Sequence, residues 1–195
     1  MPPSDIPIRS GDLDALASEA RRQTEEVHAL LGGLDHAART WRPAPDRWSV
    51  AGHVAHMCLV NGPYVAAMRD CASRARSKGR LADGPYRHPW LASWFARNME
   101  PPPKQRVRTM GSMVPDPDVA DPVADFAATQ DALVSLLEDA RGVDLGRARF
   151  PSPFFRLLRL SLGTGFHTLL AHNRRHVWLA REVMAAEGFP SAPGG

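Results

Sequence analysis

The sequence has little cysteine and no long apolar run. Its two cysteines, Cys58 and Cys71, are too few and too poorly patterned for a disulfide framework, which favours a reducing compartment. No stretch of about 18 or more consecutive apolar residues occurs, so the chain offers no ordinary transmembrane helix. The N-terminal residues also lack the basic-then-apolar pattern of a secretory signal. We therefore expect a cytoplasmic protein with no membrane partner.

A strong excess of charge of either sign is missing as well. The 24 Lys and Arg residues against 21 Asp and Glu residues leave a formal net charge of +3. One basic cluster, RDCASRARSKGR at 69–80, could meet phosphate but is more typical of a solvated helix end. Nothing else resembles a nucleic-acid footprint. We expect a small-molecule substrate and no nucleic-acid partner.

What the sequence does contain is helical periodicity. In four long segments the apolar residues recur every three or four positions, which places them on one face of a helix. These segments span about 11–34, Ser49 to about Ser77, Asp121 to about Leu137, and about 157–187. No segment alternates convincingly with a period of two. The pattern predicts an all-α four-helix bundle formed by a single domain over residues 1–195, with its core at about 11–187.

Local signals mark where some of these helices begin or break. Ser49 can accept a hydrogen bond from a free backbone N–H of the first turn, so we expect it to cap the second helix. Asp121 followed by Pro122 has the pattern of a helix start. Pro63 lies inside the second helix, where it lacks an N–H and its ring clashes with the preceding turn. We therefore predict a break or strong bend near Pro63.

A long connection at about 80–119 separates the second and third helices. It is rich in proline, and its length is typical of a functional loop or of a crossover that spans the domain. A short helical piece at 90–98 carries Trp90, Trp94 and Phe95. These aromatic residues either cap a cleft or pack the crossover against the bundle, and we favour packing.

The last helix contains the stretch LLAHNRRHVWLARE, residues 169–182, in which His172 and His176 lie four positions apart. Both fall on the predicted buried stripe of that helix, and residues at this spacing face the same way. A buried imidazole without a partner costs roughly 1–3 kcal/mol, and one metal ion would satisfy both rings. From the residues alone, the pair is either a metal site or two hydrogen-bonded polar residues on an ordinary amphipathic helix. The second helix offers His53 and His56 as further candidates.

Two motifs resemble those of the DinB-like (DinB/YfiT) superfamily. The segment WRPAPDRWSVAGHVAHM resembles the family signature in which a tryptophan-serine pair opens the second helix and a histidine follows eight residues after the tryptophan; here these are Trp48-Ser49 and His56. HNRRHVWLA resembles the family's histidine pair on the last helix. The resemblance implies a four-helix bundle with a long crossover between helices two and three. It also implies a divalent metal, zinc, nickel or iron, held by His56, His172 and His176.

Other positions match the family less well. His53 falls where the family usually has an apolar residue, so the resemblance does not make it a ligand. Gly52 stands where an acidic residue is frequent. Leu179 or Ala180 replaces a glutamine that commonly follows the histidine pair, which removes one expected hydrogen-bonding side chain. Because relatives are often dimers, the resemblance also implies a homodimer.

Three functions follow from the implied site. Three imidazoles leave positions open on the ion, which is the pattern of catalytic rather than structural zinc. Some relatives resemble transferases that activate a low-molecular-weight thiol such as bacillithiol, mycothiol or glutathione, and we place this function first, with Arg175 binding a carboxylate of the thiol. We place a metal-dependent hydrolase of the YfiT type second, because hydrolysis would need a general base and the sequence indicates none. The catalytic residues beyond the metal ligands are unknown. A non-enzymatic metal-binding or stress-related protein comes third.

Overall fold

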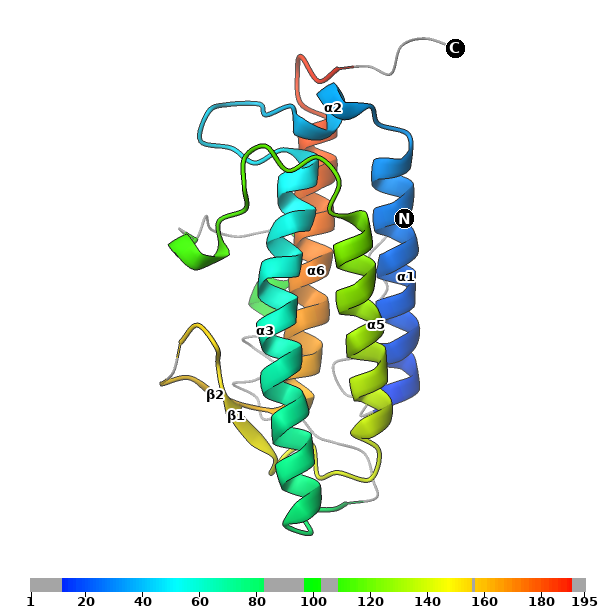
Figure 1. Ribbon diagram of the computed structural model, residues 1–195, viewed down its shortest axis with the longest axis vertical. Helices are drawn as coiled ribbons and strands as arrows, with labels where there is room; N and C mark the ends of the chain where they lie inside the picture. The colour runs from blue at the N-terminus through cyan, green and yellow to red at the C-terminus, as the bar shows by residue number, and fades with distance from the viewer. Residues whose placement is uncertain (1–11, 83–96, 103–108, 156, 191–195) are drawn as a thin grey trace.

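The computed structural model describes residues 12–82, 97–102, 109–155 and 157–190. In this part of the chain four long helices lie side by side (Figure 1). They are α1 (Leu13–Gly32), α3 (Val50–Ser77), α5 (Val123–Asp139) and α6 (Leu162–Met184). Helices α1 and α6 run in one direction, and α3 and α5 run in the other (Figure 1). The predicted all-α four-helix bundle is confirmed, as is the long connection that carries the chain from the end of α3 back to the start of α5.

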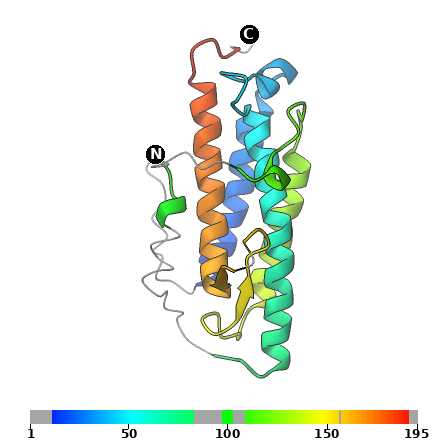
Figure 2. The same cartoon turned by 90° about the vertical axis from the view of Figure 1, so that its left-hand side faces the viewer.

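Within the described residues, four short elements accompany the bundle besides a helical turn at 97–99, and the sequence predicted none of these four. They are α2 (His36–Thr40), the 3-10 helix η1 (Gly111–Met113), β1 (Arg149–Pro151) and β2 (Arg159–Ser161). The two strands form an antiparallel hairpin in which Phe150 pairs with Leu160, and it packs beside α3 and the start of α6 (Figure 2). Strand β2 occupies residues that were predicted to begin the last helix at about 157. That helix begins at Leu162, where the Ser161 hydroxyl accepts a hydrogen bond from the Thr164 backbone N–H.

The local signals locate the starts of α3 and α5, although Pro122 rather than Asp121 is the N-cap residue of α5, and the predicted break at Pro63 does not occur. Ser49 Oγ accepts the Gly52 backbone N–H at 3.0 Å, and Asp121 Oδ1 accepts that of Val123 at 3.4 Å. Helix α3 continues without interruption past Pro63. Both Pro63 and Leu59, whose carbonyl loses its N–H donor to the proline, are exposed. Water can therefore satisfy that carbonyl, so the missing hydrogen bond does not interrupt the helix.

The core consists of two apolar clusters separated by a polar layer. One cluster contains Phe150, Phe166 and neighbouring aliphatic residues, and the other contains Val54, Met57 and Phe126. Between them along the helices lie four fully or almost fully buried amide side chains. They are Gln23 of α1, Asn61 of α3, Gln130 of α5 and Asn173 of α6.

Three of these amides hold one another and the helix backbones. Gln23 Nε2 donates to the Leu170 carbonyl at 3.0 Å, and Gln130 Nε2 donates to the Ala20 carbonyl at 3.1 Å. Asn173 Nδ2 donates to Gln23 Oε1 at 3.1 Å. These bonds join α1, α5 and α6. Because hydrogen bonds are directional and apolar contacts are not, the polar layer sets the position of each helix along the bundle axis relative to the others.

Two further predictions concern membrane-spanning helices and the connection between α3 and α5. No helix among the described residues is both long and apolar enough to cross a membrane. Of the helical piece predicted at 90–98, residues 97 and 98 are described and are helical, whereas Trp90, Trp94 and Phe95 lie outside the described residues.

Candidate metal centre

Three histidines converge between α3 and α6, which pack against each other in the bundle. His56 lies on α3, and His172 and His176 lie one turn apart on α6. Each ring offers a nitrogen that is within 4.8 Å of the nitrogens offered by the other two. The structure therefore brings together the three residues for which the family resemblance implied a metal.

The spacing of the ring nitrogens suits a metal ion. Nε2 of His56 and Nε2 of His172 are 3.2 Å apart. Zinc–nitrogen bonds of about 2.0–2.1 Å at tetrahedral angles separate two ligand nitrogens by about 3.3–3.4 Å. A neutral histidine pair can also form a direct hydrogen bond at this separation. The geometry fits both a bound ion and a metal-free pair without any large movement.

The opposite side of the His56 ring is held by the crossover. Its Nδ1–H donates to the Met113 carbonyl at 2.7 Å, and Met113 ends the short helix η1. This bond places the His56 proton on Nδ1 and leaves the Nε2 lone pair facing His172. His172 Nδ1 is buried and has no hydrogen-bond partner among the described residues.

His53 is outside the group of three but touches it. It lies on α3 one turn before His56, and its Nδ1 is 3.2 Å from Nδ1 of His176. The sequence predicted that His53 is not a ligand and gave it no other role. Its spacing from His56 was the available signal, because residues three positions apart share a helix face.

Trp48 packs against three of the four histidines. Its ring centroid is 4.7 Å from that of His56, 5.4 Å from that of His53 and 6.0 Å from that of His176. Gly52 permits this approach, since a Cβ at that position would lie 3.3 Å from Trp48 Cβ. The indole thus shields one side of the cluster from water.

Burial keeps the four rings neutral. It lowers the pKa of His53 and of His172 to about 3, and it also lowers the pKa of His56 and of His176. The neighbouring imidazoles reinforce the effect at His53, His172 and His176, because a second positive charge beside the first is unfavourable. Neutral imidazoles carry the lone pair that a metal requires, so the rings are competent ligands at neutral pH.

The two remaining sequence features have different surroundings. Arg175 is half-buried and lies close enough that its charge contributes to the lowered pKa values of His172 and His176. Its Nη1 donates to the Asn98 carbonyl at 3.4 Å. Ala180 is buried in an apolar cluster, and Leu179 is half-buried. Neither position that replaces the family glutamine therefore carries a polar side chain. The His56 ring bonds instead to the Met113 carbonyl, and the His176 ring to His53.

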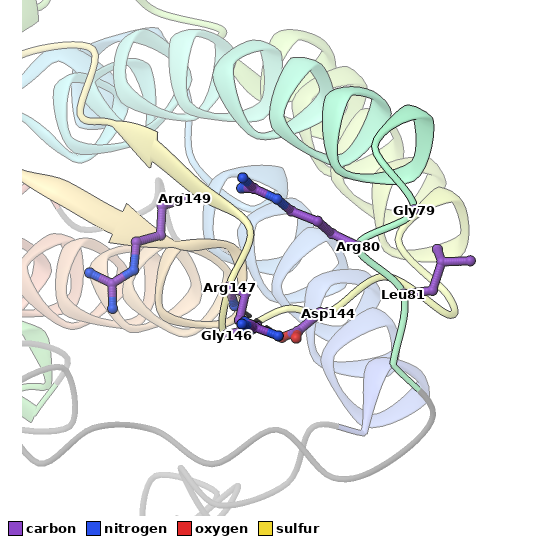
Figure 3. A pocket seen from close by; sticks show the side chains of 7 residues that line it. All are labelled: Gly79, Arg80, Leu81, Asp144, Gly146, Arg147 and Arg149. Carbon is purple, nitrogen blue, oxygen red and sulfur yellow. Dashed lines mark hydrogen bonds between the residues drawn. The ribbon is translucent and has the colours of Figure 1, made fainter.

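The basic cluster of the sequence contributes nothing to this centre. Arg69 forms a 2.8 Å ion pair with Asp139, and Arg76 donates to the Asp139 carbonyl at the end of α5. Arg80 lines a pocket of about 510 Å³ beside Arg147 and Arg149 at the far end of α3 (Figure 3). All three of these arginines are exposed, and no histidine lines the pocket. The cluster matches the predicted solvated helix end.

Comparison with known proteins agrees with the two motifs. The profile of the DinB superfamily matches residues 19–180, a range that contains all three histidines of the centre. No curated protein and no solved structure matches the chain.

Proposed function

Because this chain belongs to the DinB superfamily, we propose that His56, His172 and His176 hold one divalent metal ion, zinc, nickel or iron, in a metal-dependent enzyme. The convergence of three neutral ring nitrogens from two helices carries the proposal. No Asp, Glu or Cys among the described residues joins the group. Three neutral ligands leave the full charge of the ion in place and leave room for a further ligand, as in catalytic zinc sites.

We propose that the enzyme transfers a low-molecular-weight thiol, such as bacillithiol, mycothiol or glutathione, to an electrophilic small molecule. When bound, the ion would supply Lewis acidity that favours the deprotonated form of a thiol. A thiol held on the ion would release its proton to solvent at neutral pH, because a metal lowers its ordinary pKa of about 8.5, so it requires no general base from the protein. Hydrolysis is typically assisted by a positioned general acid or base. Within the described residues the ligand group includes no carboxylate, and Nδ1 of His53 is already paired with His176. These observations favour the transferase over the hydrolase.

Two residues of the chain are assigned supporting roles in this proposal. Trp48 excludes water from one side of the cluster, which strengthens electrostatic interactions there. Arg175 places a positive charge beside His172 and His176, where it binds a carboxylate of the incoming thiol. In this proposal the role of Arg175 is therefore in thiol affinity.

The first experiment measures metal content of protein purified without a histidine tag, and then thiol conjugation. Glutathione, bacillithiol and mycothiol are each offered with a bromobimane electrophile, with the metal-free protein and His172→Ala as controls. Metal-dependent acceleration with one thiol is the expected result. Cleavage of a nitrophenyl ester without any thiol would replace the transferase by the hydrolase. Bound metal with neither reaction would leave a binding protein, and absence of metal binding would overturn the site.

A further inference from the structure

We propose that His53 is a positioning residue, which accepts a hydrogen bond from Nδ1–H of His176 and thereby turns Nε2 of His176 toward the metal. This inference rests on the proposed metal site. The two Nδ1 atoms are 3.2 Å apart, and the two side chains come from α3 and α6. Both residues are buried, with exposed fractions of 8% for His53 and 7% for His176.

The assignment follows from counting protons. A neutral imidazole carries one N–H and one lone pair, so two facing nitrogens form a hydrogen bond only if one of them is protonated. If Nε2 of His176 gives its lone pair to a metal, its proton must be on Nδ1. Nδ1 of His53 must then be the acceptor, and the proton of His53 must be on Nε2. Metal binding at His176 therefore fixes the tautomers of both rings.

The surroundings of His53 suit it to this role. Its side chain is buried in the contact between α3 and α6, so its hydrogen bond with His176 is shielded from water. The Trp48 ring, in an edge contact at 5.4 Å, restricts the His53 ring from rotating away.

His53 also differs chemically from the usual partner of a ligand histidine. Such partners are commonly carboxylates, carbonyls or water, and a carboxylate raises the basicity of the ligand ring. The carbonyl of Met113 is the partner of His56, and the neutral imidazole of His53 is the partner of His176. Neither adds a negative charge, so the ion keeps more of its positive charge for a bound substrate.

The test compares two replacements of His53. His53→Leu keeps an apolar body but removes the acceptor, whereas His53→Asn retains a short side-chain oxygen near the position of Nδ1. Zinc affinity is measured by competition with a chromophoric chelator. We expect His53→Leu to weaken binding by about 10- to 100-fold, as is typical for a lost partner of a ligand histidine, and His53→Asn to recover most of that loss. His28→Leu, at an exposed position of α1, serves as the control and should bind as the wild type does.

The outcomes separate this inference from the site on which it rests. If the wild type binds no zinc, the metal site itself fails. If the wild type binds zinc and His53→Leu binds equally well, the site stands and the role of His53 is overturned. Equal weakening by His53→Leu and His53→Asn would mean that His53 acts through packing alone, which also overturns it.

A spectroscopic measurement on the wild type tests the inference even if the His53 variants do not fold. Nitrogen-15 NMR of the imidazole rings in the zinc-loaded wild type distinguishes a protonated nitrogen from one with a free lone pair. We expect the proton of His176 on Nδ1 and that of His53 on Nε2. A proton on Nδ1 of His53 in the zinc-loaded protein would overturn the assignment without any substitution.

Discussion

Nε2 of His56 lies 3.2 Å from Nε2 of His172, although 116 positions separate the two residues in the chain. The packing of α3 against α6 creates this contact. An ion held there would join the two helices, so metal binding and folding should be thermodynamically linked. The predictions below follow from that link and from the buried groups around it.

Removing either member of the contact should abolish stabilisation by metal. His56→Ala and His172→Ala each remove one of three ligands, so metal binding should weaken sharply and little metal should remain bound. With the metal at about 100 times its Kd, the wild type should gain about 2.7 kcal/mol, and the variants should gain almost nothing. Thermal melting with and without chelator measures the difference, with His28→Ala as the control. Equal chelator effects in all four proteins would mean that no site exists.

The metal-free protein should lose stability as the pH falls below about 6.5. The folded-state pKa of His53 and of His172 is lowered to about 3, against an ordinary value of 6.5. Between these values the unfolded chain binds more protons than the folded one. Each ring therefore lowers the free energy of unfolding by up to about 1.4 kcal/mol for every unit by which the pH falls. Above the ordinary value the contribution is constant. Urea denaturation with chelator, from about pH 7.5 down to about pH 5, measures the slope.

His172→Leu supplies the matched comparison for that pH dependence, because it removes one of the two rings whose pKa is lowered to about 3 and leaves the surface charges unchanged. The free energy of unfolding of this variant should fall less steeply with falling pH than that of the wild type, by up to about 1.4 kcal/mol per pH unit, which corresponds to one proton. Identical slopes would show that His172 is not held neutral by burial.

Trp48 should report metal binding through its fluorescence. The indole lies 4.7 Å from the His56 ring and 6.0 Å from the His176 ring, so an ion at these rings changes its surroundings directly. Nickel should quench the emission with a saturable dependence on concentration. Trp48→Phe should lose that response but retain metal, as measured by chelator competition. Trp178→Phe, on the same helix as His176, is the control and should keep the response.

The polar layer should be costly to disrupt. Gln23→Ala removes the acceptor of Asn173 Nδ2 and the donor to the Leu170 carbonyl, and both of these partners are within the core. Asn173 Nδ2 keeps a longer bond to Gln130 Oε1, but the loss of the buried hydrogen bonds of Gln23 should lower the free energy of unfolding by about 1–3 kcal/mol. Glu25→Ala, at an exposed position two residues further along α1, should change it by less than about 0.5 kcal/mol. A similar effect of both substitutions would contradict the role of the layer.

The sequence carried enough information for the bundle and for the identity of the converging histidines. Apolar spacing located the four long helices because each buries one face, and Ser49 marked a helix start through purely local chemistry. His172 and His176 were recognisable as a pair from their spacing. His56 required the family motif, since no local rule relates residues on two different helices.

Features that depend on tertiary contacts were missed. Gln23 is a polar residue on the buried face of α1, and its burial follows only from its hydrogen bonds with Leu170 and Gln130 on other helices. The break at Pro63 was wrong because the exposure of the Leu59 carbonyl is set by how α3 sits in the bundle, which the residue type does not reveal. His53 resembled a misplaced polar residue until His176, 123 positions away, supplied its partner.

The separation of His56 from His172 also orders events during synthesis. At about 5–20 residues per second, the ribosome adds His172 about 6–23 seconds after His56. During that interval the growing chain contains His53 and His56 but neither His172 nor His176, so it cannot complete the group of three ligands. An ion bound by all three histidines would therefore have to arrive after α6 has been synthesised, when the contact between α3 and α6 can form.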